Sequence, residues 1–127
     1  MIFQRWLYPM RWVGKKYESA AAAFLKKRGW KLLHRNYSCR LGEVDLIFRD
    51  LKGAIVFVEV KFRFSRDFGS GEEFVGAEKQ KRLARAALFY IKEKNLEGRD
   101  FRFDVAAVSP KGIEHIPNAF SPEGYTL

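Results

Sequence analysis

Apolar residues follow two different spacings along this chain, and the spacing predicts the order of its elements. From Lys15 to Arg28 they recur at helical intervals, and a run of alanines favours the same conformation. From Ala54 to Phe64 the chain is rich in Val, Ile and Phe, which is typical of a strand. The whole pattern predicts helices at 15–28 and 74–95, strands at 30–37, 43–49, 54–64 and 101–108, and a short edge strand around 113–116.

This order predicts one α/β domain. The turn residues at 50–53 join 43–49 and 54–64 into a hairpin, and a helix that crosses over to the last core strand implies some parallel pairing. The expected fold is therefore an αβββαβ core with a mixed sheet flanked by helices, over residues 14–127. Residues 1–13 are expected to form an N-terminal extension. They are aromatic, but Arg and Pro interrupt them, unlike a signal peptide or membrane span.

Composition and charge add a class of partner. The apolar fraction of 47% supports a folded core, and a single cysteine, Cys39, excludes an internal disulfide and favours a cytoplasmic setting. Met1–Gly42 contains ten Lys or Arg and one acid, whereas the remainder contains fourteen of each sign. This asymmetry favours a polyanion, with nucleic acid first and anionic lipid second. A basic surface that only aids solubility is the alternative.

The strand at 54–64 carries two charges inside an apolar run. Alternation puts its valines on one face and Phe57, Glu59 and Lys61 on the other. Charges buried without partners are costly, so we expect other groups to compensate them.

The hairpin register supplies a partner. If Leu51–Gly53 forms a three-residue loop, Asp50 faces Ala54 and Asp45 lies opposite Glu59. Directly opposite residues have Cβ atoms about 4.5–5.5 Å apart. Two facing carboxylates repel, so either one takes a proton or a cation lies between them. Acidic oxygen ligands favour a hard cation such as Mg²⁺.

Two further acids belong to this hypothesis. Glu43 lies opposite Lys61 in the same register, and we favour it as a partner that holds the lysine rather than as a ligand. Glu18 is the only acidic residue among the first 42 and lies at the margin of the helical apolar stripe. It fits a metal-site role and a surface pairing with Lys15 equally well.

The segments Gly-Glu-Val-Asp-Leu-Ile at 42–47 and Phe-Val-Glu-Val-Lys-Phe-Arg at 57–63 resemble the YraN-type family of small bacterial proteins. That family is proposed to consist of endonucleases of the PD-(D/E)xK, restriction endonuclease-like superfamily, distantly similar to archaeal Holliday junction resolvases. The resemblance extends from about Gly14 to Val108, although the proline that precedes the aspartate in the generic motif is absent before Asp45. Other matching positions are Glu18, Arg35-Asn36-Tyr37, Lys79 and Arg102-Phe103-Asp104-Val105.

The resemblance implies a role for each residue of the candidate site. Asp45 and Glu59, with the Val60 carbonyl, would bind Mg²⁺, for which Mn²⁺ would substitute, and Glu18 would complete the acidic cluster. Lys61 would orient or deprotonate an attacking water and stabilise the charge that develops on phosphorus. The implied catalytic set is thus Glu18, Asp45, Glu59 and Lys61.

Basic residues near these segments are the candidates for contacts to a nucleic-acid backbone. The start of the 74–95 helix suits a phosphate because its positive end points there. The candidates are Lys15, Lys16, Arg35, Arg63, Arg66, Lys79 and Arg82. Asp104 and His115, in contrast, are expected to have structural roles.

The leading hypothesis is a metal-dependent endonuclease that hydrolyses DNA phosphodiester bonds, with branched or repair intermediates as candidate substrates. A homodimer would suit the cutting of two strands, and no membrane partner is expected. The alternative is a catalytically inactive nucleic-acid-binding module with a nuclease-like fold. A third reading is a protein whose basic face docks on an acidic partner.

Overall fold

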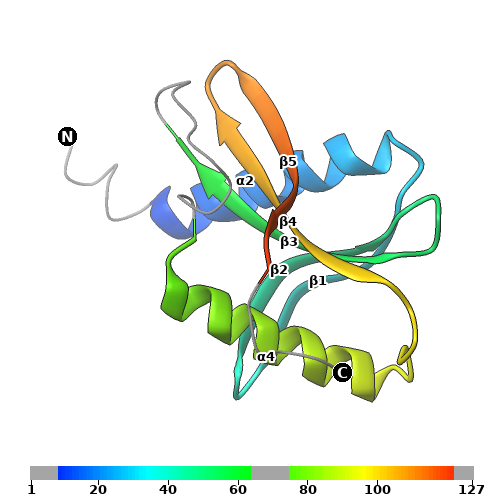
Figure 1. Cartoon of the computed structure of the whole chain (residues 1–127). Helices are drawn as coiled ribbons and strands as arrows, with labels where there is room; N and C mark the ends of the chain where they lie inside the picture. Colours follow the sequence, from blue (N-terminus) through cyan, green and yellow to red (C-terminus); the bar gives the residue numbers. More distant parts are fainter. Residues whose placement is uncertain (1–8, 64–74, 122–127) are drawn as a thin grey trace.

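The computed structural model describes residues 9–63 and 75–121, which form two helices and a five-stranded sheet (Figure 1). The strands lie in the order β1-β2-β3-β4-β5, and all neighbours are antiparallel except β3 and β4. The predicted αβββαβ order and mixed sheet are confirmed. The elements are α2 (Pro9–Lys26), β1 (Lys31–Cys39), β2 (Gly42–Arg49), β3 (Ile55–Phe62), α4 (Ala77–Glu93), β4 (Phe101–Ser109) and β5 (Gly112–Phe120).

Two elements are several residues longer than the sequence pattern predicts. Helix α2 begins at Pro9 and so includes part of the expected extension, because proline is well tolerated in the first turn of a helix. Strand β5 has nine residues and accommodates Pro117 because it is an edge strand. The β4–β5 register shifts near Asp104, whose Oδ1 accepts a hydrogen bond from the Asn118 amide at 2.9 Å. That bond gives the irregular end of β5 a fixed partner.

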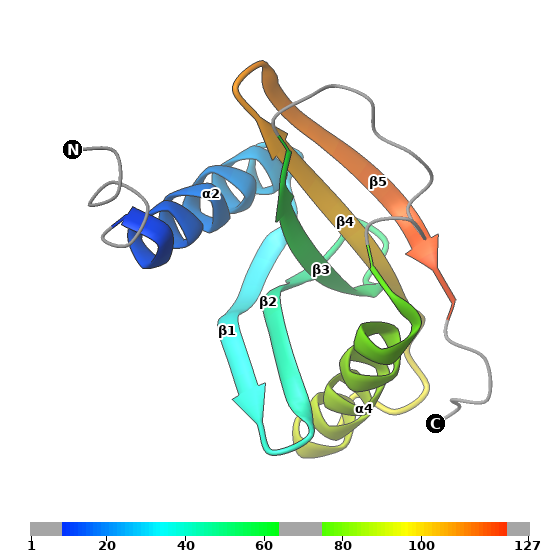
Figure 2. The same ribbon diagram turned by 90° about the vertical axis from the view of Figure 1, so that its left-hand side faces the viewer.

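The two helices cover opposite faces of the sheet (Figures 1 and 2). The core against α2 contains Val56 and Val58 of β3, whereas the core against α4 contains Phe57. The alternation predicted for the third strand is therefore confirmed. The buried residues of α4 form its sheet-facing stripe: Leu83, Ala84, Ala86, Ala87, Tyr90 and Ile91.

Strand β2 changes face halfway along its length. Val44 packs in the α4-side core and Leu46 in the α2-side core, although residues two apart in a regular strand share a face. The neighbouring β1 residue Asn36 has a positive φ of 51°, a conformation that asparagine tolerates better than most residues. Asp45 lies between Val44 and Leu46, at the point where the strand changes face.

The β1–β2 hairpin packs closely on α4. A Cβ atom at Gly42 would lie 2.8 Å from the carbonyl oxygen of Arg82, which is closer than real Cβ contacts. Glycine therefore allows the start of β2 to rest on the helix backbone, and this contact fixes the distance between α4 and the acidic residues that follow in β2.

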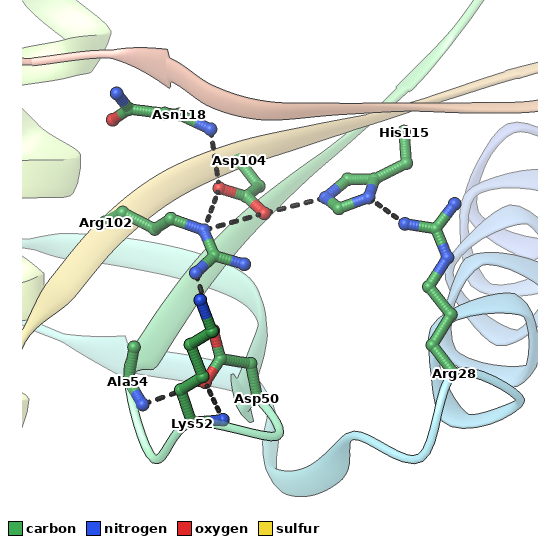
Figure 3. A network of polar contacts seen from close by, with 8 residues as sticks. All are labelled: Arg28, Asp50, Lys52, Ala54, Arg102, Asp104, His115 and Asn118. Carbon is green, nitrogen blue, oxygen red and sulfur yellow. Dashed lines mark hydrogen bonds and ion pairs between the residues drawn. The ribbon is translucent and has the colours of Figure 1, made fainter.

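A polar network around the buried Asp104 links β4 and β5 with the β2–β3 turn and with the segment after α2 (Figure 3). Asp104 is fully buried and accepts hydrogen bonds from Arg102 Nε at 3.0 Å and His115 Nε2 at 2.7 Å. Arg102 also pairs with Asp50 of the β2–β3 turn at 2.7 Å, and His115 contacts Arg28 beyond α2. The structural roles expected for Asp104 and His115 are confirmed.

Candidate functional site

An open cleft of about 280 Å³ lies where β2 and β3 separate. The β2–β3 ladder runs from Arg49 and Ile55 to its last pair, Leu46 and Val58, in the predicted register. Asp45 and Glu59 come next along the two strands, where the ladder has ended. The cleft is lined by Gly42, Glu43, Asp45, Glu59, Lys79, Arg82 and Leu83.

Asp45 and Glu59 form a carboxyl pair at the inner end of the cleft. Asp45 Oδ2 accepts a hydrogen bond from the Val60 amide at 2.8 Å and so replaces the missing ladder contact between the strands. Glu59 is only 5% exposed. Burial, then the hydrogen bond and the charge of Asp45, raises the pKa of Glu59 to about 8. Burial and the Asp45 charge thus favour the protonated form of Glu59, which is one of the two predicted outcomes for facing carboxylates, while the charges of Lys79 and Lys61 oppose it.

Two lysines approach Glu59 from different elements. Lys61 follows on β3 and is half-buried, and burial lowers its pKa, with the Glu59 charge opposing and the Lys79 charge adding to the effect. Lys79 comes from α4, with Nζ 3.2 Å from Glu59 Oε1. Burial alone would lower the pKa of Lys79, but the charge and hydrogen bond of Glu59 raise it overall. The site thus holds one lysine that loses its proton more readily and one that keeps it.

Glu18 reaches the same region from α2. Burial and the charge of Asp45 raise its pKa, while Arg35 and a hydrogen bond from Asn36 oppose the shift. Within the described part of the chain, its Oε1 atom is buried and has no hydrogen-bond partner. A buried oxygen without a partner is costly, so a further group is needed to satisfy it.

The donor set fits a hard divalent cation. Asp45 and Glu59 contribute paired carboxylates, and Glu18 contributes an unsatisfied oxygen next to them. Across residues 9–63 and 75–121, however, no three acidic, histidine or cysteine side chains converge as a ready-made metal cluster. Glu18 approaches with α2 and Glu59 faces α4, so Asp45 connects them at the turning point of β2. The Val60 carbonyl stays a predicted ligand.

The expected pairing of Glu43 with Lys61 is wrong. Glu43 is exposed at the cleft wall, and in the described residues Lys61 forms no ion pair with it. The β2–β3 ladder ends before it reaches these two positions, so they are not held opposite each other. Lys61 instead interacts with Glu59 and Lys79.

The residues predicted to contact a nucleic-acid backbone lie on α2, on β1 and around the cleft. Lys15 and Lys16 are exposed on α2. Arg35 is exposed on β1 and donates to Ser19 Oγ at 2.9 Å. Arg82 lines the cleft beside Lys79, Arg63 follows β3 with its Nη1 on the Phe62 carbonyl, and Arg66 lies outside the described residues.

Sequence reasoning named two residues only as motif positions and missed how they shape the site. Asn36 bonds Glu18 and adopts the left-handed conformation where β1 and β2 change face. An asparagine inside a strand pattern was the available signal, because it is uncommon there and tolerates positive φ. Gly42 was seen only as part of a motif. Its contact with Arg82 depends on helix packing that no local pattern contains.

Fold and site together define an α/β protein with a carboxyl pair and two lysines in a cleft between separating strands. The model of the Uncharacterised protein family UPF0102 matches residues 17–108, and the chain belongs to this family. The resemblance to the YraN-type family drawn from the motifs is confirmed, and membership of the PD-(D/E)xK superfamily stays a prediction.

Two relatives illustrate the similarity. A UPF0102 protein of Sulfurihydrogenibium sp. strain YO3AOP1 is 47% identical over 110 residues, which cover 87% of this chain and 95% of the relative. A UPF0102 protein of Syntrophus aciditrophicus strain SB is 48% identical over 111 residues, covering 84% and 87%.

The similarity to a solved structure is weaker. An EndoMS-dsDNA2 complex matches with a TM-score of 0.40 and 21% identity, covering 72% of this chain and 36% of that chain. A similarity of this size decides nothing about function. Separately, no helix among the described residues is long and apolar enough to cross a bilayer.

Proposed function

We propose that this protein is a metal-dependent endonuclease that hydrolyses DNA phosphodiester bonds. The observation that carries the proposal is the Asp45–Glu59 carboxyl pair in an open cleft, with Glu59 buried, Asp45 half-buried and a half-buried Lys61 next to them. A structural ion pair would place only opposite charges together, whereas this site also places two carboxyl groups of like charge side by side. Strongly perturbed groups in a cleft are typical of sites that carry out chemistry.

The chain's own residues divide the reaction between them. Asp45 and Glu59 would hold Mg²⁺ or Mn²⁺, with Glu18 and the Val60 carbonyl as further donors. A divalent cation bound there would polarise the scissile phosphate and lower the pKa of a bound water. Lys61, with its lowered pKa, would take the proton of the attacking water as its oxygen bonds to phosphorus and the bond to the leaving sugar oxygen breaks.

The basic surface supports a polyanionic substrate. Ten of the 24 basic residues lie in the first 42 positions, beside one acid. Lys15, Lys16 and Arg35 expose positive charge on α2 and β1, and Arg82 does so at the cleft. Arg63 and Arg66 follow β3 in sequence and belong to the same proposal. The family resemblance favours DNA as the substrate. A more specific version of the proposal is a homodimer that cuts branched DNA.

The test is cleavage of a panel of linear, flapped and four-way DNA, with an RNA duplex as comparison, in Mg²⁺, Mn²⁺ or EDTA. Lys61→Ala should abolish cleavage and leave folding and DNA affinity nearly unchanged, because the side chain is half-buried and surrounded by polar groups. Lys52→Ala, in the exposed β2–β3 turn, is the matched control. Metal-dependent cleavage that persists in both Asp45→Ala and Lys61→Ala proteins would refute the proposal.

A second candidate is a nucleic-acid-binding module without activity. The observation that favours it is that no three potential ligands converge in the described residues. Salt-sensitive DNA binding combined with no cleavage in either metal, and no stabilisation by metal, would support this candidate over the nuclease.

A further inference from the structure

Lys79 occupies an unusual place for a lysine of a helix surface. Its side chain is 40% exposed, yet its ammonium group lies 3.2 Å from an oxygen of Glu59, which is 5% exposed. The lysine therefore reaches inward from α4 and covers the carboxyl group from the solvent side. It brings a positive charge to the side of Glu59 that faces the cleft.

Lys61 and Lys79 both interact with this one carboxyl group. The two lysines are also close enough to each other to interact directly, so each positive charge is placed near a like charge. A divalent cation on Glu59 would bring two further positive charges to the same oxygens. Like charges a few ångströms apart and shielded from water repel strongly, so the three cations cannot share the carboxyl group without loss.

The two lysines differ in their freedom to move away. Lys61 is two residues from Glu59 on the same strand, and the β3–β4 ladder holds its backbone beside Ala107. Lys79 lies near the start of α4, has a long flexible stem and already exposes part of its side chain to solvent. Of the two ammonium groups, that of Lys79 leaves Glu59 at lower cost.

Given the metal-dependent function proposed above, we infer that Lys79 is a positioning residue that holds the place of the metal ion. Its ammonium group neutralises Glu59 in the metal-free protein and gives up that position when a divalent cation binds. A displaced ammonium group turns toward the open cleft, whose rim also carries Arg82. Metal binding thereby frees a positive charge for a substrate phosphate.

The test is the stability of Lys79→Gln compared with the parent protein, by urea unfolding at pH 9 in EDTA and in saturating Mg²⁺. A pH above neutral favours the charged form of Glu59, which the ion pair with Lys79 requires. In EDTA the variant should be the less stable, because it lacks the counter-ion. In Mg²⁺ the difference should disappear, because the lysine has already left. By linkage, the Mg²⁺ dissociation constant of the variant should be roughly threefold to tenfold lower than that of the parent.

Lys81→Gln is the matched control, since Lys81 carries the same charge two residues further along α4 and pairs with exposed Glu78. Its effects on stability and on Mg²⁺ affinity should both be smaller than those of Lys79→Gln. The double variant Glu59→Gln, Lys79→Gln should show no additional loss in EDTA over Glu59→Gln alone. If Lys79→Gln does not fold, Lys79→Met, which keeps the length of the side chain and removes its charge, takes its place in the same comparison.

A second measurement follows the freed charge. In the Lys61→Ala background, where DNA is expected to stay intact, Lys79→Gln should weaken duplex binding in Mg²⁺ and not in EDTA. The salt slope of binding should fall by about 1 in Mg²⁺ only.

The outcomes separate this inference from the function on which it rests. An equal loss of stability in EDTA and Mg²⁺ would show that Lys79 stays on Glu59, and no loss in either would show that the ion pair does not matter. Both results overturn the inference while Mg²⁺ still stabilises the parent protein. If Mg²⁺ does not stabilise the parent protein, the proposed function itself fails.

Discussion

Replacing Glu59 by glutamine should make the metal-free protein more stable at neutral pH. Glu59 has a pKa of about 8 in the folded protein against a model value of 4.5. The raised pKa means that stability from this group is complete below pH 4.5 and is lost as the pH rises toward 8. Glutamine has nearly the same shape, can donate to Asp45 as the protonated acid does, and carries no charge to bury.

The size of the effect follows from the same shift. Each pKa unit corresponds to ~1.4 kcal/mol, and pH 7 lies about 2.5 units above the unfolded value. Glu59→Gln should therefore gain at most about 3 kcal/mol at pH 7. At pH 4 it should gain nothing, because the acid is then protonated in both states. The side chain is 5% exposed, so solvent screening reduces this figure little.

The assay is urea unfolding in EDTA at pH 4, 5.5, 7 and 8.5. Glu78→Gln is the control, because Glu78 lies on α4 with a side chain that is 85% exposed. Its stability difference from the parent should stay small at every pH. A stability difference for Glu59→Gln that does not grow between pH 4 and pH 8.5 would refute the reasoning. Added Mg²⁺ should stabilise the parent protein and not Glu59→Gln, which lacks a metal ligand.

Three further substitutions test how the fold positions the site. Gly42→Ala should cost about 1–3 kcal/mol, because its Cβ would lie 2.8 Å from the Arg82 carbonyl; an unfolding curve no worse than that of Gly14→Ala, whose Cβ meets nothing within 4 Å, would contradict the close contact. Asn36→Ala should cost ~1 kcal/mol and Asn36→Gly less, because only the alanine pays for the positive φ; thermal unfolding that ranks them in reverse would contradict this account. Asp104→Asn should cost roughly 3 kcal/mol by removing the anion of a buried charged network, while Mg²⁺ still stabilises the variant; a lost response to Mg²⁺ would mean that this network belongs to the site.

The sequence alone determined the order of the elements and the register of the hairpin. Hydrophobic spacing is local information, and it placed the helices and four strands before any tertiary contact was known. The register followed because Asp50 faces Ala54, with the Asp50 amide bonded to the Ala54 carbonyl at 3.0 Å. A turn of fixed length sets the pairing of every residue after it, so Asp45 and Glu59 were predictable as neighbours.

The family motifs added the lysine beside them, but they could not predict what each group contacts. Lys79 was expected to contact a phosphate, and its ion pair with Glu59 was not foreseen. The expected bond between Glu43 and Lys61 is absent from the described contacts because the strands separate after Leu46 and Val58. Pairing rules hold only while a ladder continues, and nothing in the sequence marks where this one ends.

Only the tertiary structure decided how three elements meet at the cleft. The face change in β2, next to the positive φ of Asn36, lets Asp45 connect Glu18 from the α2 side with Glu59 on the α4 side. Strict alternation could not foresee it. The same holds for the pKa of Glu59, because burial and the nearby charges arise from packing that brings residues far apart in sequence together. The chain specified which groups the site contains, and helix-on-sheet packing specified which of them lose water and which charges they face.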